Sequence, residues 1–193
     1  MKNLRIGVAM CGSFCTFDTV LNALSGLSER EAYQLMPIMS ETAFATDSRF
    51  GPAADFIARL ETLCGAPVLH TIPQVEPIGP KGLLDVLLVA PCTGNTLAKL
   101  AAGVTDTAVT MAAKAHLRNG RPLVLAVSTN DGLSASAPNI GALMNRKNVY
   151  LVPFRQDDPV KKPASLVADF SLLEDAVLAA LEGRQLQPML LSR

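Results

Sequence analysis

The sequence contains no tryptophan, and aromatic residues make up only 5% of its 193 positions. Proteins that hold single-stranded nucleic acid usually stack the bases on aromatic side chains, so no such platform is expected here. Seventeen basic residues balance seventeen acidic ones, which removes the positive field that nucleic acid or an anionic membrane surface requires. Neither nucleic acid nor a membrane is therefore an expected partner.

The chain also lacks paired cysteines and long hydrophobic runs. Its four cysteines show no CxxC spacing, so we expect reduced thiols and neither a disulfide framework nor a metal site. The first apolar run, 6–11, is too short for a signal-peptide core, and no stretch approaches the length of a transmembrane helix. A soluble, cytoplasmic protein is expected.

What the chain has in abundance is apolar residues, at 49% of the sequence, with a mean hydropathy of +0.29. These values are high for a small monomer and favour a sheet buried on both faces together with some burial between subunits. Its length suits one domain, 1–193, better than two. We therefore expect a single-domain homo-oligomer.

Short apolar runs alternate with helical patterns along the whole chain. The segment 67–81 holds too many prolines and glycines for a long element and is predicted to be a loop. Alternation of this kind predicts an α/β fold with a doubly wound parallel sheet, whose ligands bind at the carboxyl ends of the strands. The predicted strands are 6–10, 35–39, 83–90, 122–127 and 149–152, and the predicted helices are 16–27, 53–63, 96–102, 107–117, 139–144 and 172–181.

Three predicted strands end in small polar residues. Gly12 and Ser13 follow the first strand, where a helix N-terminus would offer free N–H groups to a phosphate, and Ser40 follows the second. Each is also explained by helix capping alone. The third turn is richer than capping requires, and its hydroxyl, amide and main-chain groups suit a planar heterocycle; it comprises Thr93, Gly94, Asn95 and Thr96.

The segment 90–106, APCTGNTLAKLAAGVTD, resembles the flavoprotein family that includes the flavin-containing cysteine decarboxylases and the flavin prenyltransferases. This resemblance implies a Rossmann-like flavoprotein fold and FMN as cofactor. It places the flavin phosphate at Gly12 and Ser13 and the isoalloxazine at the third turn. His70 lies in the region of the decarboxylases' catalytic histidine, but a lone histidine in a loop is more often a surface residue, and no catalytic residue is assigned. His116, late in a helix, is expected to be a structural cation.

The segments 128–133 (STNDGL) and 153–163 (PFRQDDPVKKP) narrow the resemblance to members of the family that form one half of a two-component bacterial sporulation enzyme. The resemblance implies a small dicarboxylate substrate, a partner chain that binds NADP, a trimer-based homo-oligomer and the cytoplasm of a mother cell. Asn130 is expected to donate to a substrate carboxylate. The loop 155–162 is expected to bring Arg155, Lys161 and Lys162 to the same substrate.

Two other functions stay open. The Pro-Cys turn and the segment 119–125 also suit a flavin prenyltransferase, which needs no partner. Alternatively, the chain is a scaffold that stabilises its partner and has no catalytic role. The cysteine decarboxylases themselves carry a Pro-x-Met-Asn-x-x-Met-Trp segment that is absent here, so decarboxylation of a peptidyl cysteine is not expected.

Overall fold

The structure, a computed structural model, describes residues 3–192. Four parallel strands form its centre in the order β2-β1-β3-β4; they are β1 (Leu4–Met10), β2 (Tyr33–Met39), β3 (Val86–Cys92) and β4 (Leu123–Thr129). A short fifth strand, β5 (Val149–Leu151), runs parallel to the first half of β4. The chain passes from β1 outward to β2 and then back to β3 on the other side. This reversal defines a doubly wound sheet and confirms the predicted fold class.

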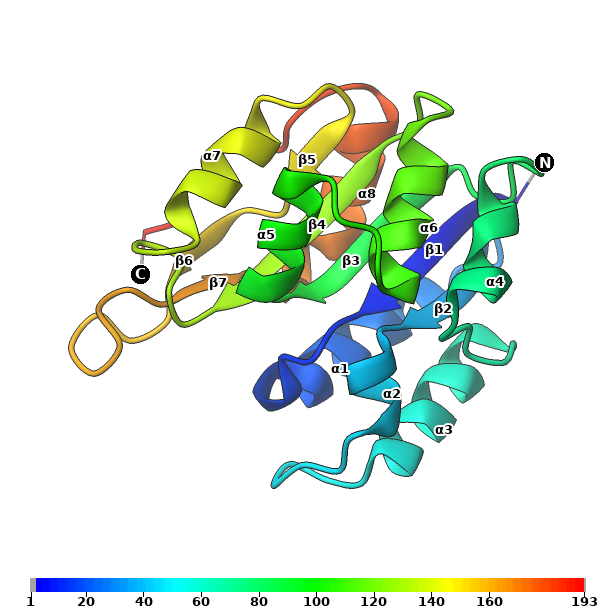
Figure 1. The fold of residues 1–193 in the computed structure, drawn as a ribbon, viewed down its shortest axis with the longest axis horizontal. Helices are drawn as coiled ribbons and strands as arrows, with labels where there is room; N and C mark the ends of the chain where they lie inside the picture. The colour runs from blue at the N-terminus through cyan, green and yellow to red at the C-terminus, as the bar shows by residue number, and fades with distance from the viewer. Residues whose placement is uncertain (1–2, 193) are drawn as a thin grey trace.

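The sequence pattern predicts β5 as the last strand, but the sheet continues beyond it. Two short antiparallel strands, β6 (Phe154–Gln156) and β7 (Leu166–Ala168), extend it, and β7 pairs with the end of β4. The predicted loop 155–162 is therefore partly a strand. Each new strand has only three residues and lies in a proline-rich stretch, so neither produces a detectable alternating pattern. Figure 1 shows the loop between β6 and β7 projecting from the body of the molecule.

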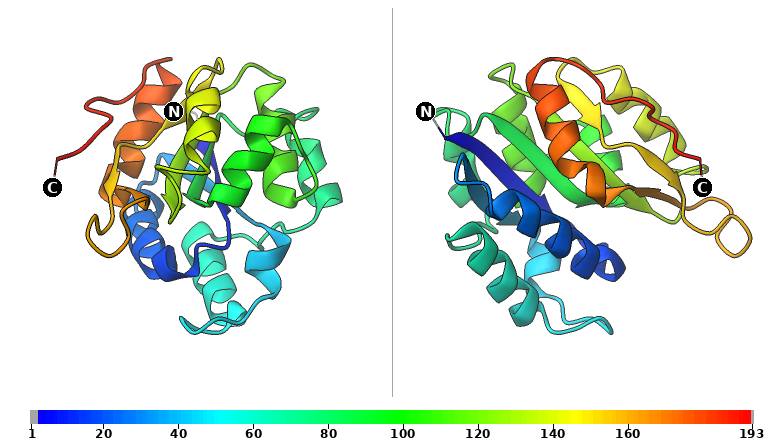
Figure 2. Two further views of the ribbon diagram at one scale, coloured as in Figure 1. Left: turned by 60° about the vertical axis from the view of Figure 1, so that its left-hand side comes forward. Right: turned by 180° about the vertical axis from the view of Figure 1, so that it is seen from behind.

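Helices cover both faces of the sheet. One face carries α1 (Phe17–Ser28) and α8 (Leu173–Leu181), which contact each other and lie side by side when the molecule is seen from behind (Figure 2, right). The other face carries α5 (Gly94–Ala102), α6 (Ala108–Leu117) and α7 (Ala137–Met144) (Figure 1). The remaining helical segments are α2 (Glu41–Ala45), α3 (Ala53–Cys64), α4 (Ile72–Val75) and the 3-10 turns Phe14–Thr16, Glu76–Ile78 and Phe170–Leu172.

Helix α1 illustrates why these segments are helical. Its buried residues Val20, Leu21, Leu24 and Leu27 recur at helical spacing and pack against the sheet. Strand β3 is buried along its whole length, as a central parallel strand covered on two faces must be. The core therefore lies between the sheet and the two helical layers, and the polar residues that follow the strands are collected at one edge.

Between β2 and β3, the structure differs from the prediction in two segments. The segment 67–81, predicted to be a loop, contains α4 and the 3-10 turn Glu76–Ile78, because Thr71 and Gln74 form a capping box that stabilises a short turn among the prolines. The predicted strand 83–90 begins only at Val86. Asp85 precedes it, and its carboxylate accepts hydrogen bonds from Arg5 Nε at 3.1 Å and the Arg5 main-chain N–H at 3.0 Å. Among residues 3–192, no helix is both long and apolar enough to cross a bilayer.

A candidate ligand site at the carboxyl edge of the sheet

The turn after β1 is joined to the end of β4 across the intervening strand β3. The Ser13 and Ser128 hydroxyl oxygens lie 2.8 Å apart, and the Cys11 main-chain N–H donates to the Pro91 carbonyl at 3.2 Å. Ser128 is not among the predicted site residues, although its position at the polar end of a buried strand marks it. The three strand ends thus form one continuous surface at the β1–β3 switch point, where doubly wound proteins bind their ligands.

The turn after β1 is open to an anion. The main-chain N–H groups of Gly12, Phe14 and Cys15 donate no hydrogen bond within the described part of the chain, and they precede the 12-residue helix α1. A Cβ on Gly12 would meet no protein atom closer than the Phe14 ring at 3.5 Å, so close packing does not require this glycine. The missing side chain leaves room for a ligand to approach the main chain. Free N–H groups at a helix N-terminus bind phosphates. These features fit the predicted phosphate position.

The turn after β2 is built differently. The Ser40 hydroxyl caps α2 by accepting the Ala43 N–H at 3.2 Å, so capping accounts for this residue. Glu41 Oε1 accepts the Ala108 N–H at 3.0 Å, at the first residue of α6, while its Oε2 is buried with no partner in the described residues. The negative charge beside Ser40 disfavours a phosphate here, so the first turn is the better suited of the two to an anion.

The turn after β3 combines capping with exposure. Thr93 caps α5 by accepting the Thr96 N–H at 3.2 Å, and its hydroxyl donates to the Thr96 hydroxyl at 3.1 Å. Thr96 is buried, whereas Asn95 is exposed and has its amide available. Gly94 lies so close to the loop after β4 that a Cβ would stand 2.6 Å from Ser136 Oγ. Packing within the protein therefore explains why position 94 is a glycine.

That packing involves Asp131, which is not among the predicted site residues although it lies in the segment 128–133. Its carboxylate accepts hydrogen bonds from the hydroxyls of Thr129 and of Ser136, the latter at 2.8 Å. These bonds, the Thr129 bond foremost, lower the pKa of Asp131. The carboxylate thus lies between the first residues of α5 and α7, where the positive ends of two helix dipoles meet. Asp131 faces inward, and its neighbour Asn130 is exposed at the edge.

The buried thiols at this edge are not nucleophiles. Burial raises the pKa of Cys11 to about 11 and that of Cys92 well above its usual value. Since the thiolate is the reactive form, neither supplies one at neutral pH. All four cysteines are free thiols.

The predicted substrate residues on the β6–β7 hairpin are brought partly toward this edge. Arg155 lies on β6 and pairs with Asp169 at 3.0 Å, and Lys162 pairs with Asp157 at 2.7 Å. The pKa of Lys162 is raised, chiefly by its hydrogen bond and ion pair with Asp157. Lys161 is exposed near the tip of the loop.

The two histidines occupy different environments. The His70 ring stacks on Phe44, with ring centroids 3.6 Å apart. The preceding residue, Leu69, pairs in parallel with Ile38 near the end of β2. His70 thus lies at the carboxyl edge, half-buried. His116 is expected from its sequence position to be a helix-terminal cation, and that expectation is wrong: burial lowers its pKa to about 4. The neutral ring contacts the Pro122 carbonyl through Nε2 at 3.0 Å.

Comparison with known proteins gives a consistent result. The model of the family described as Flavoprotein matches residues 1–164. The B subunit of dipicolinate synthase from Bacillus subtilis (strain 168) is 43% identical over 190 residues, which cover 98% of this chain and 94% of that protein.

Solved structures agree. The dipicolinate synthase B subunit from Bacillus halodurans C superposes with a TM-score of 0.89 at 39% identity and covers 100% of both chains. A dodecameric FMN-dependent Ubix-like decarboxylase from Escherichia coli O157:H7 gives a TM-score of 0.62 at 26% identity, over 78% of this chain and 80% of that one.

Proposed function

The chain belongs to the flavoprotein family, and from this premise we propose that it is the flavin-binding component of an enzyme that makes dipicolinate, pyridine-2,6-dicarboxylate. The observation that carries the proposal is the 43% identity to the Bacillus subtilis protein along nearly the full length of both chains. The geometry of the carboxyl edge supports it, because an open anion-binding turn lies beside an exposed polar turn at the switch point of the sheet.

The reaction converts a hydroxy-tetrahydrodipicolinate precursor into an aromatic ring. The precursor loses one water and then two hydrogens, so the second step requires a two-electron acceptor. We assign flavin binding and part of the substrate site to this chain, and NADP binding to its partner, the A subunit of dipicolinate synthase.

The residues at the edge fit FMN. The phosphate lies against the N–H groups around Gly12 and Ser13, and we assign Lys162 of the hairpin to it as a further positive charge. The flavin ring lies over the third turn, where the exposed Asn95 amide is available to its carbonyls and ring nitrogens; the turn comprises Thr93, Gly94, Asn95 and Thr96, with Ser40 at its side. When bound, the flavin supplies a two-electron acceptor.

The substrate contacts come from the loop after β4 and from the hairpin. Asn130, at the exposed edge beside the half-buried Asp131, donates its amide to one carboxylate. Arg155 and Lys161 lie on the projecting hairpin and meet the second carboxylate. Lys162 is shared between substrate and cofactor phosphate. A substrate with two negative groups is thus bound by groups that donate hydrogen bonds or carry positive charge.

The active assembly is proposed to be a trimer-based homo-oligomer in the cytoplasm of a sporulating mother cell. The high apolar fraction of the chain and the dodecameric state of the related decarboxylase support the oligomer. A sedimentation measurement that finds only a 20.4 kDa species at micromolar concentration contradicts it.

Reconstitution tests the proposed function. Purified chain and partner are supplied with precursor and NADP, and dipicolinate is followed by its ultraviolet absorbance. We expect product only when both chains are present, and much slower production when Asn130→Ala replaces the wild type in an intact complex. Full turnover by Asn130→Ala and Ser13→Asp complexes indicates a scaffold role. Prenylation of reduced FMN with dimethylallyl phosphate, without the partner, indicates a flavin prenyltransferase.

A further inference from the structure

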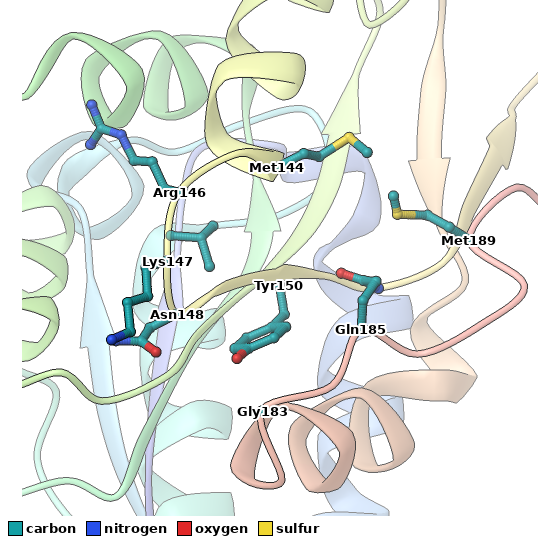
Figure 3. A pocket seen from close by; sticks show the side chains of 9 residues that line it. Met144, Arg146, Lys147, Asn148, Tyr150, Gly183, Gln185 and Met189 are labelled. Carbon is teal, nitrogen blue, oxygen red and sulfur yellow. The ribbon is translucent and has the colours of Figure 1, made fainter.

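A cavity of about 550 Å³ lies away from the carboxyl-edge site, at the other end of the sheet (Figure 3). It is formed by the turn from α7 into β5 and by the segment that follows α8. The Asn148 carbonyl accepts the Leu123 N–H at the start of β4, so the cavity belongs to the amino edge of the sheet. Its volume falls within the range of small-molecule sites.

Part of the polar lining is fixed by the fold. Gln185 pairs with the free edge of β5, accepting the Leu151 N–H at 2.8 Å and donating to the Leu151 carbonyl at 2.6 Å. Arg146 donates to the carbonyls of Leu100 and Ala101 at 3.0 and 2.7 Å, at the end of α5. These bonds hold two walls of the cavity in place before any ligand arrives.

Three other polar groups on the lining are free. Within residues 3–192, the side chains of Lys147, Asn148 and Tyr150 make no hydrogen bond or ion pair. Figure 3 shows the Lys147 and Asn148 side chains together, with the Tyr150 hydroxyl turned toward the same side. An ammonium, an amide and a phenol are thus gathered on the short segment 147–150. All three are able to donate hydrogen bonds.

The backbone that holds these donors is unusual. Asn148 has φ of 64°, and no other non-glycine residue of the described chain has a positive φ. Across the cavity, Gly183 has φ of 74°, and a Cβ there would stand 3.9 Å from the Tyr150 hydroxyl. Left-handed non-glycine residues concentrate at functional sites, and within the described residues Asn148 is the one such residue. Gly183 is the ordinary left-handed glycine after the end of α8.

The lining selects for a particular charge. It includes the cations Arg146 and Lys147 and no aspartate or glutamate among the described residues, so its field favours an anion. The thioethers of Met144 and Met189 add adaptable apolar surface to the lining. We propose that this cavity binds a small organic anion, a carboxylate carried on a flat apolar ring.

In this site the ligand carboxylate pairs with the Lys147 ammonium and accepts hydrogen bonds from Tyr150 and Asn148. The ring of the ligand lies against Met144 and Met189. The site is separate from the flavin site, because one forms at the amino edge of the sheet and the other at the carboxyl edge. Its occupation therefore does not depend on the proposed function.

Titration of ¹⁵N-labelled protein with benzoate, followed by amide chemical shifts, tests the site. We expect the Tyr150 and Gly183 amides to shift, and benzamide, the neutral analogue, to bind at least about tenfold more weakly because it lacks the charge. Lys147→Ala is expected to weaken benzoate binding by about tenfold and Tyr150→Phe by roughly three- to tenfold. Lys114→Ala, an exposed lysine on α6, is the matched control and leaves binding unchanged.

Three results overturn the proposal: benzoate produces no shifts at the cavity, benzamide binds equally well, or Lys147→Ala and Tyr150→Phe both bind benzoate normally. Tyr150→Phe keeps the volume of the side chain, so its result stands even if Lys147→Ala perturbs the turn. FMN titration of the same variants is unchanged in either case, which separates a failure here from a failure of the flavin site.

Discussion

The hydroxyl oxygens of Ser13 and Ser128 lie 2.8 Å apart, although 115 residues separate them in the chain. The bond closes the carboxyl edge of the sheet around the end of β3. It also links the turn proposed to hold the cofactor phosphate to the strand that leads to Asn130. The proposed cofactor and substrate positions are thereby linked by a direct contact.

Removing this contact has a measurable cost. Ser128→Ala leaves the Ser13 hydroxyl without its partner, and we expect the free energy of unfolding to fall by about 1 kcal/mol. Ser134→Ala is the control, because Ser134 lies in the adjacent loop and its exposed hydroxyl bonds only the Asp131 carbonyl. Urea unfolding of both variants measures the difference. Equal stability of the two variants contradicts the assignment.

Gly94 is required by close packing. In Gly94→Ala the new Cβ would lie 2.6 Å from Ser136 Oγ and 2.7 Å from Thr129 Oγ1, so we expect a loss of about 1–3 kcal/mol. Gly26→Ala is expected to have the opposite effect, because Gly26 lies inside α1 with no atom within 4 Å of the added carbon. There we expect the free energy of unfolding to rise by up to about 1 kcal/mol through helix propensity. Thermal melts should show a lower Tm for Gly94→Ala and a higher Tm for Gly26→Ala.

His116 makes stability depend on pH. Its pKa is about 4 in the folded protein and 6.5 in its unperturbed state. As pH falls below 6.5 the unfolded chain takes up a proton that the folded chain does not, so stability is lost between pH 6.5 and 4, by about 3 kcal/mol in total.

His116→Gln is expected to flatten this slope, whereas His70→Gln, the only other histidine of the chain, keeps it. The measurement is urea unfolding between about pH 5.5 and 7, above the range in which most carboxylates titrate. A wild-type stability that is flat over this interval contradicts a neutral buried His116.

The hairpin lysine Lys162 is expected to affect ligand binding. Lys162→Ala removes an ammonium from the hairpin loop and should raise the KM for the dicarboxylate by about tenfold in the reconstituted synthase. Lys114→Ala, on the exposed surface of α6, should leave KM unchanged. If Lys162→Ala has wild-type KM and wild-type FMN affinity, the charged loop is a solvated surface with no role in the site.

The sheet was predictable because its strong elements carry strong patterns. Strand β3 is a continuous apolar run, and α1 repeats its buried residues at helical spacing. The hydrophobic pattern alone therefore predicted where these two elements lie and which is a strand and which a helix. The β6–β7 hairpin was not predictable from pattern, since three-residue strands are too short to show alternation. Its pairing depends on the end of β4, which is a tertiary contact.

The site was predictable to the level of its turns. Strand ends indicated Gly12, Ser13 and Thr93, and the structure gathers them at one edge. The inward and outward directions of neighbouring side chains were not accessible from sequence: Asp131 is fixed by Thr129 and Ser136 while Asn130 is exposed. The protonation of His116 likewise depends on burial that no local pattern reveals.

FMN titration of the purified chain, followed by quenching of flavin fluorescence, tests the central claim most directly. We expect saturable binding by the wild type and at least about tenfold weaker binding by Ser13→Asp, because its carboxylate opposes the phosphate. Ser25→Asp, at the far end of α1, is expected to bind FMN as the wild type does. Absence of saturable binding by the wild type, or equal affinity of the Ser13→Asp variant, contradicts the claim.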